Sequence, residues 1–248
     1  MEPPAAFTCA VLPWDTQFFG RRLARLTVNT PIPPEWSAVA ASCRAQNIEG
    51  LYFACPSENA DLIRFAETQG FGLMDIRLEL VRPLNSPVKA MPDNGVRLRQ
   101  AQTSDLPALQ ALARSSHRNT RFFRDSHFPV THCEKLYETW ITKSVNNAEG
   151  VVWVAGEAGQ PVAYCTGERH ADVVGQIGLM AVAEGQRRLG LGRQLVLQTL
   201  AWFQQQGLKR VSVVTQGGGV PAQRLYQQCG FVTAAVALWY HKWFCDER

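Results

Sequence analysis

The residues best suited to chemistry in this chain form a basic, glycine-spaced turn that runs from Val182 to Leu195. Gly190 and Gly192 allow backbone N–H groups to converge on one point without obstruction by a Cβ atom. A helix that starts here leaves its first N–H groups unpaired, and its dipole favours negative charge at that end. Positive charge is added by three arginines, Arg187, Arg188 and Arg193. The turn therefore predicts a binding site for a phosphate group.

Two common phosphate-binding motifs are excluded by the residues around this turn. A P-loop requires Lys followed by Ser or Thr after its last glycine, whereas Gly192 is followed by Arg193 and Gln194. A dinucleotide fingerprint requires a small residue where Leu195 stands, and an acidic residue near Thr215 at the end of the next strand. A tight entry into a helix, without any ligand, remains the plain alternative.

A second candidate is Tyr226, on a predicted helix that carries Ala222 and Leu225 and is followed by Gly230 and Phe231. The ordinary pKa of tyrosine is near 10, so its hydroxyl stays protonated at neutral pH. The alternative is that Tyr226 is a half-buried aromatic residue on an amphipathic helix.

Hydrophobic periodicity predicts the elements that position these residues. In order they are a strand at 96–100, a helix capped by Thr103 or Ser104, a loop from 115, a helix at 133–145, strands at 151–155, 162–166 and 176–182, a helix after the turn, a strand at 208–215, a helix and a last strand. This order predicts an α/β fold with a mixed central sheet flanked by helices.

An internal repeat appears when Gly70-Phe71 is aligned with Gly230-Phe231, an offset of 231 − 71 = 160 residues. Residues 48–55 then fall on 208–215, and 36–46 fall on 196–206, so both copies read helix, strand, helix, strand. In the N-terminal copy the positions of Gly190, Gly192 and Tyr226 hold other residues, Thr30, Ile32 and Ala66. We therefore expect a degenerate N-terminal half at 1–88, a linker rich in Pro, Asn and Gly over 82–95, and a catalytic domain at 95–248.

The turn and the Tyr226 motif together resemble the GCN5-related N-acetyltransferase (GNAT) family over roughly residues 96–243. The family's usual motif reads Asn-x-x-Ala-x-x-Leu-Tyr-x-x-x-Gly-Phe, and this chain departs from it in placing Gly219 at the asparagine position. The resemblance implies the GNAT fold, acetyl-CoA as co-substrate and Tyr226 as the general acid. It implies cofactor contacts from Leu179, Met180, Ala181, Val182, Arg187, Arg188, Leu189, Gly190, Leu191, Gly192, Arg193, Gly219 and Ala222.

Acetyl transfer also requires a neutral amine and a polarised thioester. We expect the strand at 178–182 to diverge from the strand at 209–215, so that pantetheine enters between them and a backbone N–H near Met180 meets the thioester oxygen. The strand entering the turn has no carboxylate between Val174 and Leu179. Water is our first choice as proton acceptor, and Glu168 on the preceding strand is a second candidate.

A narrower resemblance is carried by the Trp14, Phe18-Phe19-Gly20 box, by Arg121-Phe122-Phe123 and by the segment at 137–141. These segments look like the dTDP-fucosamine acetyltransferase subfamily, which acetylates the 4-amino group of a nucleotide-linked 4-amino-4,6-dideoxygalactose. The resemblance implies that Arg121, Phe122 and Phe123 bind the acceptor, although a solvated basic loop is an equal alternative. Another small-molecule amine or a protein N-terminus as acceptor, and a non-catalytic module that binds acetyl-CoA, stay open as alternatives.

Composition limits the partners that we expect. The 248 residues are 46% hydrophobic and 19% charged, with a net charge of +4. The basic residues are dispersed, so no nucleic-acid partner is expected. Seven cysteines without a Cys-x-x-Cys pair predict reduced thiols and no metal site. The absence of a long apolar run or leader predicts a cytoplasmic protein that does not enter a membrane, with a small-molecule substrate; a homodimer is left open. The aromatic segment at 239–244 is expected in the core.

Overall fold

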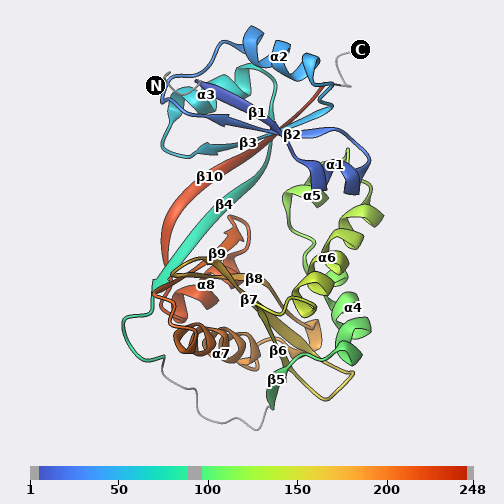
Figure 1. Ribbon diagram of the computed structural model, residues 1–248, viewed down its shortest axis with the longest axis vertical. Coiled ribbons are helices and arrows are strands. Elements are labelled where there is room, and N and C mark those ends of the chain that lie inside the picture. Colours follow the sequence, from blue (N-terminus) through green and yellow to red (C-terminus); the bar gives the residue numbers. More distant parts are fainter. Residues whose placement is uncertain (1–5, 89–96, 245–248) are drawn as a thin grey trace. The chain divides into compact units, whose positions relative to one another are not determined.

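The computed structural model describes residues 6–88 and 97–244, which form two compact units (Figure 1). Unit 1 comprises the described parts of Met1–Arg77, Thr120–Phe128 and Ala235–Arg248, and unit 2 comprises those of Leu78–Asn119 and Pro129–Ala234. Half of the predicted linker, 89–95, and the expected strand start at residue 96 lie outside the described residues. The predicted boundary between 1–88 and 95–248 stays a prediction about sequence halves, because the compact units are not contiguous in sequence.

Unit 1 contains a small sheet with strand order β1-β2-β3-β10. β1 and β2 are antiparallel, β2 and β3 are parallel, and β10 is antiparallel to β3, with Tyr240 opposite Phe53. Its elements are β1 (Phe7–Val11), α1 (Pro13–Phe19), β2 (Leu23–Val28), α2 (Trp36–Ala45), β3 (Gly50–Pro56), α3 (Ala60–Thr68), the start of β4 (Gly72–Pro83), α5 (Arg121–Arg124) and most of β10 (Val232–Trp243). Tyr240 and Trp243 are buried, which confirms the core position expected for these two aromatic residues.

Unit 2 contains the strand order β4-β9-β8-β7-β6-β5. β8 and β9 are parallel, whereas β5, β6, β7 and β8 pair antiparallel in succession, so the sheet is mixed, as predicted. Its elements beyond β4 are β5 (Leu98–Gln100), η1 (Thr103–Asp105), α4 (Leu106–Ser116), α6 (Val130–Val145), β6 (Val151–Ala155), β7 (Ala163–Ala171), β8 (Val174–Val182), η2 (Glu184–Gln186), α7 (Leu191–Gln205), β9 (Arg210–Gln216) and α8 (Val220–Gln228). The segment from 115, predicted to be a loop, contains the short helix α5.

The sheet of unit 2 has helices on both faces (Figure 1). Neighbouring residues of a strand such as β7 point to opposite faces of its sheet. A Cβ atom added to Gly167 would lie 2.8 Å from Thr199 and 3.0 Å from Phe203, both on α7. On the other face, the Tyr164 hydroxyl lies 2.8 Å from Nε2 of His117, at the end of α4. The face towards α7 and α8 packs apolar side chains such as Leu195, Phe203 and Phe231, and the face towards α4 and α6 carries the Tyr164 hydroxyl.

The internal repeat is confirmed by the element bounds. Adding 160 to the bounds of β3, α3 and β4 gives 210–216, 220–228 and 232–243, which are the bounds of β9, α8 and β10. The turn after each second helix also repeats, because Gly70 (φ +73°) and Gly230 (φ +83°) both adopt the left-handed conformation that favours glycine. The same local sequence pattern therefore builds the same supersecondary unit twice.

The last strands of the two copies are exchanged. β10, from the C-terminal copy, pairs with β3 in unit 1, while β4, from the N-terminal copy, lies beside β9 in unit 2. The hydrogen bond from Leu84 N–H to Lys209 C=O, 2.8 Å, continues the second association. This exchange explains why unit 1 includes most of β10 and unit 2 includes the second part of β4.

The residue directly before α4 is Asp105, not one of the predicted caps Thr103 and Ser104, which belong to the short helix η1. The Asp105 carboxylate accepts hydrogen bonds from both terminal nitrogens of Arg99, at 2.7 and 2.8 Å, and from the backbone N–H groups of Gln102 and Gly159. The side chain is fully buried, and the Arg99 guanidinium lowers the pKa of Asp105 to about 2. Asp105 makes no side-chain capping hydrogen bond to α4, and its carboxylate instead joins the η1 turn, β5 and the β6–β7 turn.

The described cysteines, Cys9, Cys43, Cys55, Cys133, Cys165 and Cys229, are all free thiols, and all but Cys9 are buried. Cys245 lies outside the described residues. Within residues 6–88 and 97–244, no helix is long and apolar enough to cross a membrane, and no three His, Cys, Asp or Glu residues gather as metal ligands would.

Candidate functional site

The parallel pairing of β8 with β9 ends before either strand does. The paired residues run from Val174 opposite Arg210 to Ile177 opposite Val213, yet β8 continues to Val182 and β9 to Gln216. The divergence predicted between these two strands is therefore present. Backbone groups of β8 beyond Ile177 that face β9 lack a partner on that strand, which leaves room for an extended ligand to pair there.

The turn that follows β8 is exposed and contains two left-handed residues. Residues 184–190 are all exposed. Arg188 (φ +66°) and Gly190 (φ +81°) both have positive φ, and Arg188 shares this conformation with only one other described non-glycine residue, Asn47. Alternation of left-handed residues in a turn directs successive N–H groups towards one side, where they can hold an anion.

Gly190 and Gly192 serve different purposes in this turn. Gly190 is the N-cap of α7, no side chain caps the helix, and the first hydrogen bond runs from Gln194 N–H to Gly190 C=O, 3.1 Å. The N–H groups of the first helical turn therefore point outwards for an anion. A Cβ atom at Gly192 would lie 3.2 Å from Leu225, so this glycine allows α8 to approach α7. We expected both glycines to open the anion cradle, but only Gly190 has the backbone conformation for it.

The three arginines of the turn are all exposed, and one is anchored. Arg187 donates from Nε to the carbonyl oxygen of Val182, 3.2 Å away, which folds its side chain back onto the end of β8. The remaining donors of its guanidinium have no partner in the part of the chain that the structure describes, and guanidinium groups bind phosphate oxygens well. Arg188 and Arg193 add charge on either side of Gly190.

Two predicted cofactor contacts can be made only by backbone atoms. The Leu191 side chain is 3% exposed and the Ala181 side chain is 4% exposed, and Leu191 belongs to the core of unit 2. Leu189, in contrast, is 58% exposed. Among Leu179, Met180 and Val182, all half-buried, the Leu179 N–H is already engaged, since it donates to the Thr166 hydroxyl at 2.8 Å.

Gly219 stands where the motif has asparagine, and a different residue stabilises the turn before α8. The Gln223 side-chain amide donates to the carbonyl oxygens of Gln216 and Gly217, both at 2.9 Å. A Cβ atom at Gly219 would lie 3.1 Å from the Gln216 carbonyl oxygen, so a larger residue would crowd the turn. Ala222, on the first turn of α8, is half-buried. Gln223 therefore ties α8 to the turn that precedes it.

Tyr226 projects from α8 into unit 2 on the face of the sheet that α7 covers. Its side chain is 5% exposed, its ring centroid lies 5.7 Å from that of Phe231, and its hydroxyl makes no hydrogen bond within the described residues. Burial, with a smaller contribution from the nearby thiols of Cys165 and Cys229, raises the pKa of Tyr226. The hydroxyl is therefore protonated throughout the neutral range, as a proton donor must be.

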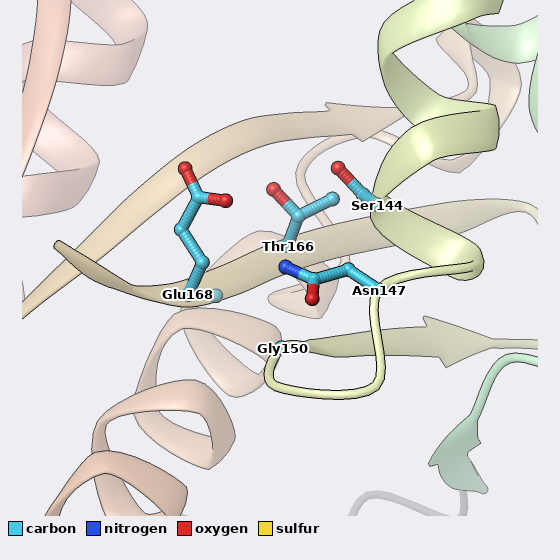
Figure 2. A pocket seen from close by; sticks show the side chains of 6 residues that line it. Ser144, Asn147, Gly150, Thr166 and Glu168 are labelled. Carbon is cyan, nitrogen blue, oxygen red and sulfur yellow. The ribbon is translucent and has the colours of Figure 1, made fainter.

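The opposite face of the sheet holds a group of polar side chains that sequence analysis did not assemble. Figure 2 shows Thr166 and Glu168 projecting from β7 on one side, with Ser144 of α6 and Asn147 around the same space. We call this space the polar hollow; its lining residues are Ser144, Asn147, Gly150, Thr166, Gly167 and Glu168. Only the spacing of Thr166 and Glu168, two residues apart on one strand face, could have indicated it.

The predicted acceptor-binding residues lie in unit 1. The Arg121 guanidinium carbon is 4.1 Å from the Phe122 ring centroid, 4.4 Å from that of Trp239 and 4.5 Å from that of Tyr52. Its Nη1 lies 3.1 Å from Nε2 of His241. Phe122 is 3% exposed, so its ring has no free face for an acceptor, contrary to our expectation. Arg121 and Phe123 are half-buried.

Comparisons with known proteins agree with this geometry. Residues 111–231 match the model of the acetyltransferase (GNAT) family. A dTDP-fucosamine acetyltransferase of Escherichia coli O6:H1 is 26% identical over 252 residues, covering 96% of this chain and 100% of the relative. The spore coat polysaccharide biosynthesis protein SpsD of Bacillus subtilis is 28% identical over 142 residues, covering 57% of this chain and 49% of its own. A solved GCN5-related N-acetyltransferase from Sphaerobacter thermophilus has the same fold, with a TM-score of 0.69, 14% identity and coverage of 96% of this chain and 76% of that one.

Proposed function

We propose that this chain is an N-acetyltransferase of the GNAT family, whose model matches residues 111–231, and that it transfers acetyl from acetyl-CoA to the amine of a nucleotide-linked amino sugar. The observation that carries the cofactor assignment is the end of β8–β9 pairing at Ile177 and Val213, directly before the exposed basic turn. The amino-sugar assignment rests on the Trp14, Phe18-Phe19-Gly20 box and on similarity along nearly the whole chain to an enzyme named for such a substrate.

The basic turn binds the pyrophosphate of the coenzyme. Backbone donors come from the free N–H groups at the start of α7 and from the left-handed residues Arg188 and Gly190. The guanidinium of Arg187 adds side-chain donors. Each charge-assisted hydrogen bond of this kind is worth about 1.5–3 kcal/mol, which is roughly one to two powers of ten in affinity. The pantetheine arm then follows the open edge of β8 from Val182 towards Ile177.

Tyr226 is the general acid in this mechanism. Its buried hydroxyl stays protonated and has no competing partner in the described residues, so it can donate to the thiolate as the carbon–sulfur bond breaks. The Met180 N–H is proposed to polarise the thioester oxygen. Arg121 and Phe123 are retained as acceptor-binding candidates, because a guanidinium suits the diphosphate of a nucleotide sugar.

Calorimetric titration with acetyl-CoA, followed by a thiol-release assay against a panel of amines, tests this proposal. We expect acetyl-CoA binding, and thiol release that depends on a nucleotide-linked 4-amino sugar. Failure to bind acetyl-CoA would reject the cofactor assignment. Turnover with other small amines or peptide N-termini alone would reject the amino-sugar acceptor, and binding without thiol release on any amine would favour a non-catalytic module.

A further inference from the structure

We propose that Cys9 and Cys43 form a dithiol site that reacts with small-molecule disulfides and closes into a reversible disulfide bond within unit 1. Cys9 lies on β1 and Cys43 on α2, whereas the coenzyme-binding residues and Tyr226 belong to unit 2. No short motif marks the pair, because the two cysteines are 34 positions apart in the sequence. The site is therefore separate from the proposed acetyl transfer.

The two sulfur atoms of this pair are already in contact. The Cys43 thiol donates a hydrogen bond to the Cys9 sulfur, with the two atoms 3.9 Å apart. α2 packs against β1 (Figure 1), and both cysteines pack in the same core cluster as Leu26, the residue of β2 opposite Cys9. A disulfide bond is about 2.05 Å long. The sulfurs must therefore approach each other by about 2 Å, which is within the reach of side-chain rotation.

Helix α2 surrounds Cys9 with hydrogen-bond donors. Gln46 Nε2 donates to the Cys9 carbonyl oxygen at 3.3 Å and to the Ser42 hydroxyl at 3.2 Å. The hydrogen bond from Cys43, with a smaller one from the Ser42 side chain, lowers the pKa of the Cys9 thiol against the opposing effect of burial. Because the thiolate is the attacking species in disulfide exchange, Cys9 is the activated thiol of the pair.

Burial gives the two thiols different roles. Cys9 is half-buried on the edge strand β1, so a small disulfide can reach its sulfur, whereas Cys43 is 1% exposed. The hydrogen bond to Cys9 and burial both raise the pKa of Cys43, so this thiol keeps its proton until its neighbour has reacted. Cys55 in the same unit is a contrast, since it is fully buried, donates to the Pro56 carbonyl oxygen and has its pKa raised by burial to about 11.

The reaction consists of two exchanges. The Cys9 thiolate attacks one sulfur of the small-molecule disulfide, forms a mixed disulfide with that half and expels the other half as a thiolate. Cys43 gives its proton to the expelled thiolate and attacks the Cys9 sulfur, which releases the second half as a thiolate. That thiolate takes up the proton that Cys9 lost on ionisation. The protein is oxidised from two thiols to one disulfide bond, and the small molecule is reduced to two thiols.

The new bond ties the edge of the sheet to α2. Among the described strands, β1 has β2 as its one neighbour, so β1 is held by hydrogen bonds on one side alone. A cross-link between residues 34 positions apart restricts the unfolded chain and holds β1 against the helix. We therefore expect the backbone amides of β1 to exchange hydrogen about tenfold more slowly in the oxidised protein.

The test adds oxidised glutathione to the folded full chain and analyses non-reduced tryptic peptides by mass spectrometry. We expect the peptides of Cys9 and Cys43 to be linked, and a reducing agent to release them. C43S should accumulate glutathione on Cys9, because no second thiol displaces it, whereas C9S should leave Cys43 unmodified. The control C55S should behave as the unaltered protein. Absence of the linked peptides, or equal glutathione uptake by C9S and C43S at the remaining thiol of the pair, overturns the proposal.

A second measurement needs no variant. Labelling of the unaltered protein with iodoacetamide at several pH values gives the reactivity of each thiol, peptide by peptide. We expect Cys9 to react at least about tenfold faster than Cys55 at pH 7, with a half-maximal rate below about pH 8.5, the ordinary thiol pKa. A Cys9 rate no greater than that of Cys55 overturns the proposal. Neither readout involves acetyl-CoA, so this inference and the proposed function stand or fail separately.

Discussion

The Leu179 backbone N–H donates a hydrogen bond of 2.8 Å to the Thr166 side-chain hydroxyl, at the point where the register between β7 and β8 shifts. This bond lies directly after the last paired residues of β8 and β9, Ile177 and Val213. The bond therefore holds the backbone of β8 from the β7 side, just after the point where pairing with β9 ends. The Thr166 side chain also lines the polar hollow.

Replacing Thr166 by valine should loosen β8 at this point. Valine has nearly the same shape but no acceptor, so the Leu179 N–H loses its partner, and we expect a loss of about 1–2 kcal/mol in the free energy of unfolding. Hydrogen exchange of the Leu179 amide should accelerate, as measured by NMR. T166S keeps the hydroxyl and should stay within about 0.5 kcal/mol of the unaltered protein. Equal Leu179 exchange in T166V and T166S would contradict this role.

Gly190→Ala should weaken coenzyme binding through the backbone. Gly190 has φ +81°, and an L-residue in that conformation costs about 1–2 kcal/mol, although nothing lies within 4 Å of the added Cβ atom. We expect the free energy of unfolding, measured by urea denaturation, to fall by this amount. We also expect calorimetry to show roughly tenfold weaker binding of acetyl-CoA. The matched control is G185A in the same loop, which also meets nothing within 4 Å but has no positive φ. Equal effects of the two variants would rule out the backbone explanation.

Tyr226→Phe should lower kcat by about 100-fold or more and leave the acetyl-CoA Kd unchanged, because it removes only the proton donor. Since burial raises the pKa of Tyr226, its titration should not reduce the rate of the unaltered protein up to about pH 10. The same shift means that the unfolded chain ionises this tyrosine first, so stability should fall as the pH rises above about 10. Full turnover by Y226F in the thiol-release assay would remove Tyr226 from the acid role.

Asp105 should make unit 2 sensitive to acid. Its folded pKa of about 2 lies below the ordinary value of about 3.9, so its stabilisation is complete above pH 4 and is lost as the pH falls towards 2. This difference between the folded and unfolded pKa of Asp105 corresponds to about 2 kcal/mol in the free energy of unfolding. D105N should be less stable at pH 7 and show a flatter decline between pH 4 and pH 2 in thermal unfolding. D172N, at an exposed turn, is the control and should keep the slope of the unaltered protein.

Asp125→Asn should destabilise unit 1. The buried Asp125 carboxylate accepts from His127 N–H and lies 2.8 Å from His127 Nδ1, 2.6 Å from His241 Nδ1 and 2.9 Å from the Trp243 Nε1 donor. Burial alone would raise its pKa, but the hydrogen bonds from His241 and Trp243 hold the pKa of Asp125 well below its usual range. We expect the free energy of unfolding to fall by about 3 kcal/mol. Urea denaturation monitored by tryptophan fluorescence measures this change.

The control for Asp125 is D61N, which breaks an exposed ion pair with Arg64 and should cost less than about 1 kcal/mol. Similar losses in D125N and D61N would show that the buried cluster adds nothing to stability.

The local chemistry of the site could be predicted from the sequence because it depends on short spacings. The Arg187 to Gly192 turn and the Tyr226 helix follow from residues within a few positions of one another, whereas the divergence of the two strands was expected from the family resemblance. The glycines illustrate the limit: the sequence indicated that Gly190 and Gly192 matter, but only the structure showed that one sets a backbone conformation and the other admits Leu225.

The sequence by itself determined two copies of helix, strand, helix and strand, and which copy carries the glycines and the tyrosine. The tertiary structure alone decided that β10 pairs with β3 while β4 lies beside β9, because two strands with the same preceding helix and Gly-Phe turn have equivalent local patterns. It likewise decided that Ser144, Thr166 and Glu168 share one hollow. Strand pairing and side-chain convergence depend on contacts between distant segments, which local periodicity does not encode.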